Sequence, residues 1–228
     1  MISGDGTKKV LILKTNNLSK ELKKVLKDSF EVFVYNSFSK IKEINPDIVI
    51  TDKLTKNSLK LLQNKYLIYI SSKIVFSNGI YDTSIEPAPI DPTGKKKYEE
   101  EKLAKKIPNH LIIRVSDIID ENYIKKITEK IKNKEEISLD NKEQIYPVRA
   151  IDVAKINKTL IEIEARRVIH IRGISRTTFY KIGLIIAEMF KTTIDHIKCI
   201  TEDKDVYNVR LLGIVYNKKI RQILKEIL

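Results

Sequence analysis

Short apolar runs alternate with polar, helix-permissive segments along the first two-thirds of the chain. Each run is mostly consecutive Val, Ile, Leu and Tyr, a pattern typical of strands covered on both faces of a parallel sheet. The predicted strands are Val10–Leu13, Glu31–Tyr35, Asp47–Ile50, Tyr66–Ile70 and Leu111–Val115. The predicted helices between them are Ser19–Lys27, about Thr55–Asn64, and Tyr98–Lys106. Strand–helix–strand alternation at this spacing predicts a doubly wound α/β sheet.

Beyond these elements, the sequence predicts a long loop, four helices and one further strand. Pro and Gly gather between Asn78 and Gly94, which favours a long surface loop. Helices are predicted at Ile124–Lys132, at Thr178–Phe190 and at Asn217–Leu228. The second of these would have Ser175 or Thr177 as its N-cap. A further helix is predicted where Val153, Ile156, Leu160 and Ile163 recur at helical spacing, and these four residues are expected to face inward. Val168–Ile171 is predicted to be a strand.

Positive charge is the strongest compositional signal. The 228 residues include 43 Lys and Arg against 30 Asp and Glu, a formal net charge of +13. Such a charge favours contact with polyanions such as nucleic acid or phosphorylated substrates. The alternative is that the positive charge only reflects amino-acid composition, since many Lys and Ile with few Gly and Met are typical of an AT-rich or heat-adapted genome. The basic residues do not interleave with aromatic ones as a base-stacking platform requires, so nucleic acid is supported by charge only.

Other global features narrow the class of protein. No apolar run is long enough to span a bilayer and no basic-then-apolar leader opens the chain, so we expect a cytoplasmic protein without a membrane partner. The single Cys199 excludes an internal disulfide and a cysteine-rich zinc site. His196 and Cys199 are metal-type ligands, but no neighbours complete a set of four, so we predict no metal.

Six segments, taken in chain order, resemble those of a known family. They are NPDIVI (Asn45–Ile50), YISSKIVF (Tyr69–Phe76), YEEEKLA (Tyr98–Ala104), LIIRVS (Leu111–Ser116), YPVRAIDVAKI (Tyr146–Ile156) and VIHIRGISRTTFYKIGLIIAEMF (Val168–Phe190). The sequence resembles the extended short-chain dehydrogenase/reductase group, within it the dTDP-4-dehydrorhamnose reductases and the regulatory β subunit of methionine adenosyltransferase. The resemblance implies an α/β fold, a Rossmann-like doubly wound parallel sheet with a small C-terminal substrate-side lobe. In one domain of residues 1–228, residues 8–120 would form the cofactor-type core, and residues 121–228 the lobe and the last core elements.

The family's Tyr-x-x-x-Lys pattern occurs twice, from Tyr69 to Lys73 and from Tyr98 to Lys102. With ten Tyr and abundant Lys, one or two such matches are expected by chance. Two residues four apart share one face of a helix, whereas on a strand they lie about 13 Å apart. Only Tyr98 and Lys102 fall in a helical segment, so we select that pair.

The resemblance implies roles in carbonyl reduction for three residues. Tyr98 would be the acid/base, Lys102 would lower the pKa of that tyrosine and hold the nicotinamide ribose, and Ser72 would hydrogen-bond the substrate carbonyl. A nearby ammonium does favour a phenolate. Three glutamates between Tyr98 and Lys102 work against it, so the alternative is that the pair lies on the surface of a charged helix.

The resemblance also implies a bound NADP or NAD at the turn after the first strand, within LKTNNLSKEL. The family has three glycines there, which let the backbone approach the pyrophosphate, and this turn has none. The residues that could compensate with polar groups are Lys14, Thr15, Asn16 and Ser19. Asn36 could meet an adenosine ribose or its phosphate, with a plain loop as the alternative. We therefore do not expect ordinary tight binding of NAD(P), while weak or altered nucleotide binding stays open.

Arginines cluster around the turn at Gly173. In the resemblance this region lies near the sugar-nucleotide cleft, so Arg172 and Arg176 are candidate substrate-binding residues. A solvated basic face is the alternative.

Three functions fit these features. The first is a divergent dTDP-4-dehydrorhamnose reductase-like protein that reduces a keto-sugar nucleotide with NAD(P)H. The second is a catalytically inactive regulatory or scaffold subunit with a protein partner, and the third is a basic adaptor that binds RNA. Relatives often dimerise through helices of the cofactor domain, one of which is short here, so a homodimer stays open.

Overall fold

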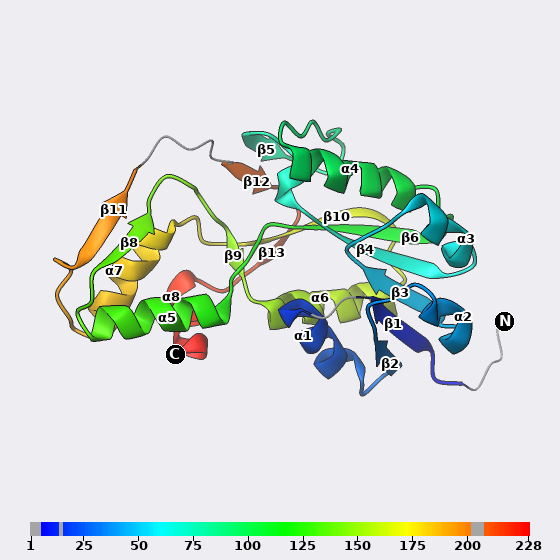
Figure 1. Ribbon diagram of the computed structural model, residues 1–228, viewed down its shortest axis with the longest axis horizontal. Coiled ribbons are helices and arrows are strands. Elements are labelled where there is room, and N and C mark those ends of the chain that lie inside the picture. The colour runs from blue at the N-terminus through cyan, green and yellow to red at the C-terminus, as the bar shows by residue number, and fades with distance from the viewer. Residues whose placement is uncertain (1–5, 14–15, 202–207) are drawn as a thin grey trace. The chain divides into compact units, whose positions relative to one another are not determined.

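The computed structural model describes residues 6–13, 16–201 and 208–228 (Figure 1). The chain forms two compact units, each assembled from separate stretches of sequence. Unit 1 comprises Met1–Val75, Pro89–Val115 and Ala150–Ile169, and unit 2 comprises Phe76–Ala88, Ser116–Arg149 and His170–Leu228.

The main sheet has seven strands in the order β13-β10-β6-β4-β3-β1-β2. Its strands are β1 (Lys9–Leu13), β2 (Glu31–Val34), β3 (Ile48–Thr51), β4 (Tyr66–Ser72), β6 (His110–Val115), β10 (Arg167–Gly173) and β13 (Ile214–Tyr216). β1 pairs in parallel with β2 and β3, β3 with β4, β4 with β6, and β10 with β13. The strand order reverses between β1 and β3, which is the switch point where doubly wound sheets open a crevice. The predicted Rossmann-like parallel sheet is therefore confirmed.

Helices of unit 1 lie on both faces of this sheet (Figure 1). They are α1 (Asn17–Leu26), α2 (Lys40–Ile44), α3 (Leu59–Leu62), α4 (Pro92–Ala104) and α6 (Ala150–Glu162), with the 3-10 turns η1 (Lys56–Ser58) and η2 (Lys73–Val75). α1 packs against α6, whereas Ile41 of α2, Leu62 of α3 and Ala104 of α4 join one core cluster. Strand residues such as Leu11 and Val49 complete that cluster and are fully buried. Runs of β-branched and Leu residues therefore pack against an apolar layer on each face of the sheet, as expected for a covered parallel sheet.

Unit 2 is built from helices and three two-stranded sheets. Its helices are α5 (Glu121–Lys132), α7 (Phe179–Met189) and α8 (Ile220–Ile227). The strand pairs are β8 (Ile137–Asp140) with β11 (Ile197–Ile200), β5 (Gly79–Tyr81) with β12 (Val209–Leu211), and β7 (Asp117–Ile118) with β9 (Pro147–Val148). α8 buries Ile223, Leu224 and Ile227 in the core cluster that also contains residues of α5 and α7. The tail helix therefore packs on its own unit.

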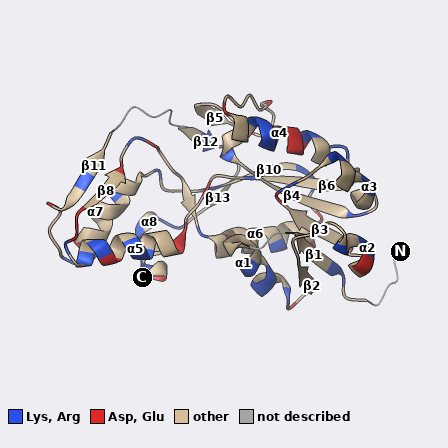
Figure 2. Cartoon of the chain, in the orientation of Figure 1, with Lys and Arg blue, Asp and Glu red and all other residues tan. Residues whose placement is uncertain are grey.

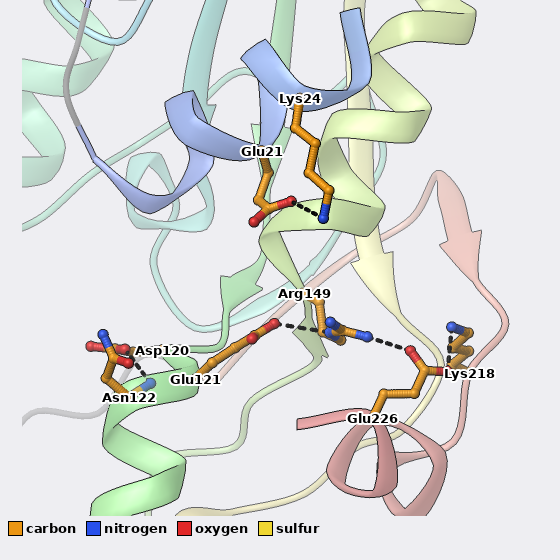
Figure 3. A network of polar contacts seen from close by, with 8 residues as sticks. All are labelled: Glu21, Lys24, Asp120, Glu121, Asn122, Arg149, Lys218 and Glu226. Carbon is orange, nitrogen blue, oxygen red and sulfur yellow. Dashed lines mark hydrogen bonds and ion pairs between the residues drawn. The ribbon is translucent and has the colours of Figure 1, made fainter. Parts of the chain in front are cut away.

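An ion-pair network joins α5 to α8 within unit 2 (Figure 3). Arg149, only 16% exposed, places its Nε 2.9 Å from Glu121 at the start of α5. Its other guanidinium nitrogen pairs with Glu226 of α8, which also contacts Lys218 at 2.5 Å. The C-terminal helix is therefore held by charge as well as by its apolar face.

The start of α4 differs from the prediction. The helix begins at Pro92, ahead of the predicted start at Tyr98. Asp91 is its N-cap and accepts a hydrogen bond from the Gly94 N–H at 2.9 Å. Proline suits the first helical turn because its missing N–H would have no partner there. The predicted loop between Asn78 and Gly94 therefore contains this helix start and the strand β5.

Two other helix details were predicted wrongly. Ile163 was expected to face inward, but it lies beyond the end of α6 and is 66% exposed. Asn157 takes an inward position instead and is fully buried, with its side-chain N–H donating to the Val153 carbonyl at 2.9 Å. The N-cap of α7 is Thr178, one residue or more after the predicted caps.

None of the helices in the described ranges is both long and apolar enough to cross a bilayer.

Candidate functional site

The three predicted catalytic residues lie in unit 1, on β4 and α4. Ser72 is the last residue of β4, at the carboxyl end of that strand. Tyr98 and Lys102 share one face of α4, with Lys102 Nζ 4.5 Å from the centroid of the tyrosine ring. The same ammonium lies 2.7 Å from the Glu99 carboxylate. Tyr98 is 9% exposed, so it is a buried residue rather than a surface one.

The other glutamates between Tyr98 and Lys102 face inward and have partners of their own. Glu101 is fully buried and pairs with Arg114 at 2.7 Å. Ser71 donates to the same carboxylate at 2.5 Å. These contacts fix one side of α4 to β4 and β6, and they pair the buried charge of Glu101 with that of Arg114.

Tyr69, the tyrosine of the other Tyr-x-x-x-Lys match, is a core residue. It is fully buried on β4, and its hydroxyl donates to Glu100 at 2.6 Å. Burial, with the Glu100 hydrogen bond second, raises the pKa of the Tyr69 phenol far above its ordinary value. This tyrosine therefore stays protonated and cannot supply a phenolate near neutral pH.

The predicted cofactor turn precedes α1. Lys14 and Thr15 lie outside the described residues. Asn16 is the N-cap of α1, and its side-chain oxygen accepts from the Ser19 N–H at 2.9 Å. In return, the Asn16 N–H donates to Ser19 Oγ at 2.7 Å. Both residues of this pair therefore form a capping box, in which each side chain satisfies the backbone N–H of the other.

The capping box of Asn16 and Ser19 does not fit a dinucleotide pyrophosphate. Such a phosphate group needs free backbone N–H groups at a helix N-terminus and close approach of the backbone. Here two of those N–H groups already donate to side chains, and Ser19 is 2% exposed.

Asn36 lies just after β2 and is exposed. The role near an adenosine ribose that the resemblance implies for Asn36 stays a prediction.

A pocket lies within unit 2 and has a cavity volume of about 220 Å³. Its lining residues are Gly79, Ile80, Gln144, Tyr146, Arg176, Asn208 and Arg210. Two of these are arginines, and none of the lining residues that the structure describes is acidic. Paired guanidinium groups without a carboxylate favour an anionic ligand, above all a phosphate.

Arg172 is not a lining residue of this pocket, but it contacts the lining residue Tyr146 and carries a further positive charge. Its guanidinium carbon lies 5.4 Å from the ring centroid of the lining residue Tyr146, and one terminal nitrogen donates to the Gly173 carbonyl at 2.9 Å. Its Nε is buried and has no hydrogen-bond partner among the described residues. Burial first, and the charge of Arg210 second, lower the pKa of Arg172. The structure thus brings the predicted Arg172 and Arg176 into one arginine cluster with Arg210.

Asn208 holds three parts of the pocket wall together. Its N–H donates to Asn78 Oδ1 at 2.7 Å, and its carbonyl accepts from the Gly79 N–H at 3.1 Å. Its own side-chain oxygen accepts from the Gln144 N–H at 2.9 Å. Pairing of β12 with β5 then sets Arg210 opposite Ile80.

Sequence reasoning missed Arg210, Asn208 and Gln144. Gln144 lies far from Asn208 and Arg210 in the chain, and the strands β5 and β12 at this pocket are three residues each. Such short strands leave no periodic signal, because strand alternation needs about four residues or more to be read.

Lys and Arg also lie on helices and strands of both units (Figure 2). This distribution follows the scatter of basic residues in the sequence. The described residues contain no group of three or more His, Cys, Asp or Glu placed to hold a metal ion.

Comparison with protein families and solved structures gives two results. The family model described as "RmlD substrate binding domain" matches residues 57–210. A search of curated protein sequences finds no match.

Among solved structures, dTDP-4-dehydrorhamnose reductase from Bacillus anthracis in complex with NADP has a TM-score of 0.79 at 17% identity, covering 97% of this chain and 99% of that one. The Yersinia enterocolitica dTDP-4-dehydrorhamnose reductase has a TM-score of 0.80 at 16% identity, covering 96% and 98%. dTDP-glucose 4,6-dehydratase from Bacillus anthracis in complex with NAD has a TM-score of 0.78 at 11% identity, covering 96% and 94%. At these identities the likeness concerns the fold.

Proposed function

The chain belongs to the RmlD substrate binding domain family, and from that premise we propose that it binds a sugar nucleotide in the arginine-lined pocket of unit 2. The single observation that carries the proposal is the presence of Arg176 and Arg210 in the lining of a pocket without an acidic lining residue among those described. Solved relatives named as dTDP-4-dehydrorhamnose reductases and a dTDP-glucose 4,6-dehydratase support the ligand class, since each name contains a dTDP-linked sugar.

The pocket volume indicates which part of the ligand is held. Pockets that enclose a whole drug-sized ligand measure about 300–1,000 Å³. A cavity of about 220 Å³ is too small for a complete sugar nucleotide and suits its diphosphate with an adjoining group. Arg176 and Arg210 would then bind phosphate oxygens, and Gln144 and Asn208 would donate or accept at neighbouring hydroxyls.

Loss of one guanidinium should therefore weaken binding strongly. A charge-assisted hydrogen bond contributes about 1.5–3 kcal/mol, which corresponds to roughly a tenfold to hundredfold change in affinity. Isothermal titration with dTDP-glucose should give a saturable isotherm for the native chain and one at least about tenfold weaker for Arg210→Ala and Arg176→Ala.

A matched control is Arg221→Ala, which removes an exposed arginine of α8 from the same unit. Its affinity for dTDP-glucose should equal that of the native chain. Absence of binding to dTDP-glucose and UDP-glucose, or equal affinity in the pocket variants and the control, would refute the proposal.

Reduction of a keto-sugar nucleotide with NADPH or NADH is a second candidate function. The observation that favours it is the burial of Tyr98 beside Lys102 on α4, a helix that packs against the strand ending in Ser72. A regulatory or scaffold subunit is the competing role, and the capping box of Asn16 and Ser19 favours it. An activity assay separates the reductase from the regulatory or scaffold subunit. The chain is mixed with a dTDP-keto-sugar and NADPH, and the absorbance of the reduced cofactor is followed. Turnover that disappears in Tyr98→Phe would establish the reductase.

A further inference from the structure

We infer that the N-terminus of α1 has been converted from a phosphate-binding end into a self-capped helix end, so that the chain binds sugar nucleotide without binding NAD(P) tightly. Rossmann-like sheets normally receive a pyrophosphate at this helix, because its first N–H groups have no partner inside the helix. In this chain the helix supplies those partners itself. The conversion concerns unit 1 and is independent of the arginine pocket of unit 2.

The geometry of the cap is complete. Asn16 has an extended backbone, at φ −138° and ψ −174°, as an N-cap residue should. The two reciprocal bonds between Asn16 and Ser19 measure 2.7 and 2.9 Å, and Ser19 Oγ also donates to the Asn16 carbonyl at 2.8 Å. All three distances are short enough for well-formed hydrogen bonds.

Burial makes the cap difficult to displace. Ser19 is 2% exposed, so its side chain has no open space into which it could rotate when an anion approaches. In a glycine loop the same positions carry no side chain, and the phosphate meets the N–H groups directly. A pyrophosphate would here have to break two made hydrogen bonds before it gained its own.

The expected cost in affinity is large. A hydrogen bond from an N–H group to a charged acceptor is worth roughly a tenfold to hundredfold factor in binding. Two such bonds unavailable at α1 should weaken cofactor binding by about a hundredfold or more. A dinucleotide site of micromolar affinity would then bind only at about 0.1 mM or weaker.

The state of Lys102 agrees with this. The resemblance assigns that ammonium to the nicotinamide ribose, whereas in the structure it lies 2.7 Å from Glu99. Their side chains are 47% and 67% exposed, so this ion pair is weak and is secondary to the helix cap.

The test is titration of the full chain with NADPH and NADH, followed by calorimetry and by cofactor fluorescence. The native chain should show no saturable binding below about 0.1 mM. The variant Asn16→Gly/Ser19→Gly removes both capping side chains and should bind NADPH at least about tenfold more tightly than the native chain.

The chain contains a matched control in a second capping box. At the start of η1, the Thr55 N–H donates to Ser58 Oγ at 3.1 Å, and the Ser58 N–H donates to Thr55 Oγ1 at 3.3 Å. Thr55→Gly/Ser58→Gly should lower the melting temperature as a lost cap does, but leave the affinity for NADPH as in the native chain.

Two outcomes would overturn the inference. One is micromolar NADPH binding by the native chain, and the other is a folded Asn16→Gly/Ser19→Gly variant that binds no better than the native chain. If that double variant does not fold, Ser19→Gly alone serves under the same criteria. Titration with dTDP-glucose is run in parallel, so that failure of sugar-nucleotide binding refutes only the proposed function.

Discussion

Replacing Glu101 with Gln should destabilise the protein far more than any other single charge change on α4. The Glu101 carboxylate is fully buried, and the Arg114 side chain is 2% exposed. Arg114 contacts both carboxylate oxygens, through Nε at 3.0 Å and through a terminal nitrogen at 2.7 Å. Ser71 adds a hydrogen bond at 2.5 Å. Removing the negative charge leaves a guanidinium charge buried without its carboxylate.

The magnitude follows from that burial. Removing one member of a buried ion pair costs about 3–5 kcal/mol, which is a large fraction of the roughly 5–15 kcal/mol that stabilises a typical domain. For a chain of this length the melting temperature should fall by about 6–20 °C. Replacing Glu101 and Arg114 together with Met should restore much of the loss, since a buried ion pair and an apolar pair of similar volume are often nearly equal in stability.

The assay is urea unfolding followed by circular dichroism, with Glu99→Gln as the control on the same helix. Glu99 forms an exposed pair with Lys102, so its loss should cost at most about 0.5 kcal/mol. The reasoning is wrong if Glu101→Gln costs less than about 1 kcal/mol, or if the double Met variant is no more stable than Glu101→Gln.

Three further changes have defined outcomes. Arg149→Ala should lower stability by about 1 kcal/mol and speed hydrogen exchange of the α8 amides, because the helix loses its pair with Glu226. Gly173→Ala should destabilise by about 3 kcal/mol or more in thermal melting, because a Cβ there would lie 2.1 Å from the Pro147 carbonyl oxygen. The hydrogen bond from Lys218 lowers the pKa of Glu226 below its ordinary value of 4.5. A depressed carboxyl pKa stabilises the fold at higher pH, so the small contribution of Glu226 should disappear as the pH falls below 4.5, and melting curves of Glu226→Gln should lack that part of the pH dependence.

The main sheet could be predicted from the sequence because its strands are buried on both faces. β3 and β4 consist of Ile, Val, Leu and Tyr with few polar interruptions, and burial on two sides leaves little freedom in residue type. The strands of unit 2 were missed for the opposite reason. β5 and β11 contain exposed residues and are only three and four residues long, so their packing produces no recognisable pattern of apolar and polar residues in the sequence.

The candidate sites were predictable to a different extent. Ser72, Tyr98 and Lys102 were selected through order and spacing, and the structure places Ser72 on β4 and the other two on α4, while their catalytic roles stay a prediction. The inward turn of Glu101 was not foreseeable, since charged residues in a run normally face water and only a partner distant in sequence reverses that preference.

Arg210 escaped prediction in the same way. A lone arginine carries no sign that Gln144, Tyr146 and Arg176 from other segments will line the same pocket. Local secondary-structure propensity does not predict contacts between residues distant in sequence, because these contacts form only in the complete tertiary fold.

The interleaving of the two units has a consequence for biosynthesis. The chain crosses from one unit to the other five times. The last segment of unit 1, Ala150–Ile169, is synthesised only after the first two segments of unit 2, Phe76–Ala88 and Ser116–Arg149. At about 5–20 residues per second, the ribosome needs roughly 5–20 s to proceed from residue 75 to residue 169. During that interval the nascent sheet displays an apolar face that α6 will later cover, so a chaperone that binds exposed hydrophobic surface should engage the ribosome-bound intermediate. No contiguous truncation of the gene would release either half as a self-sufficient fragment.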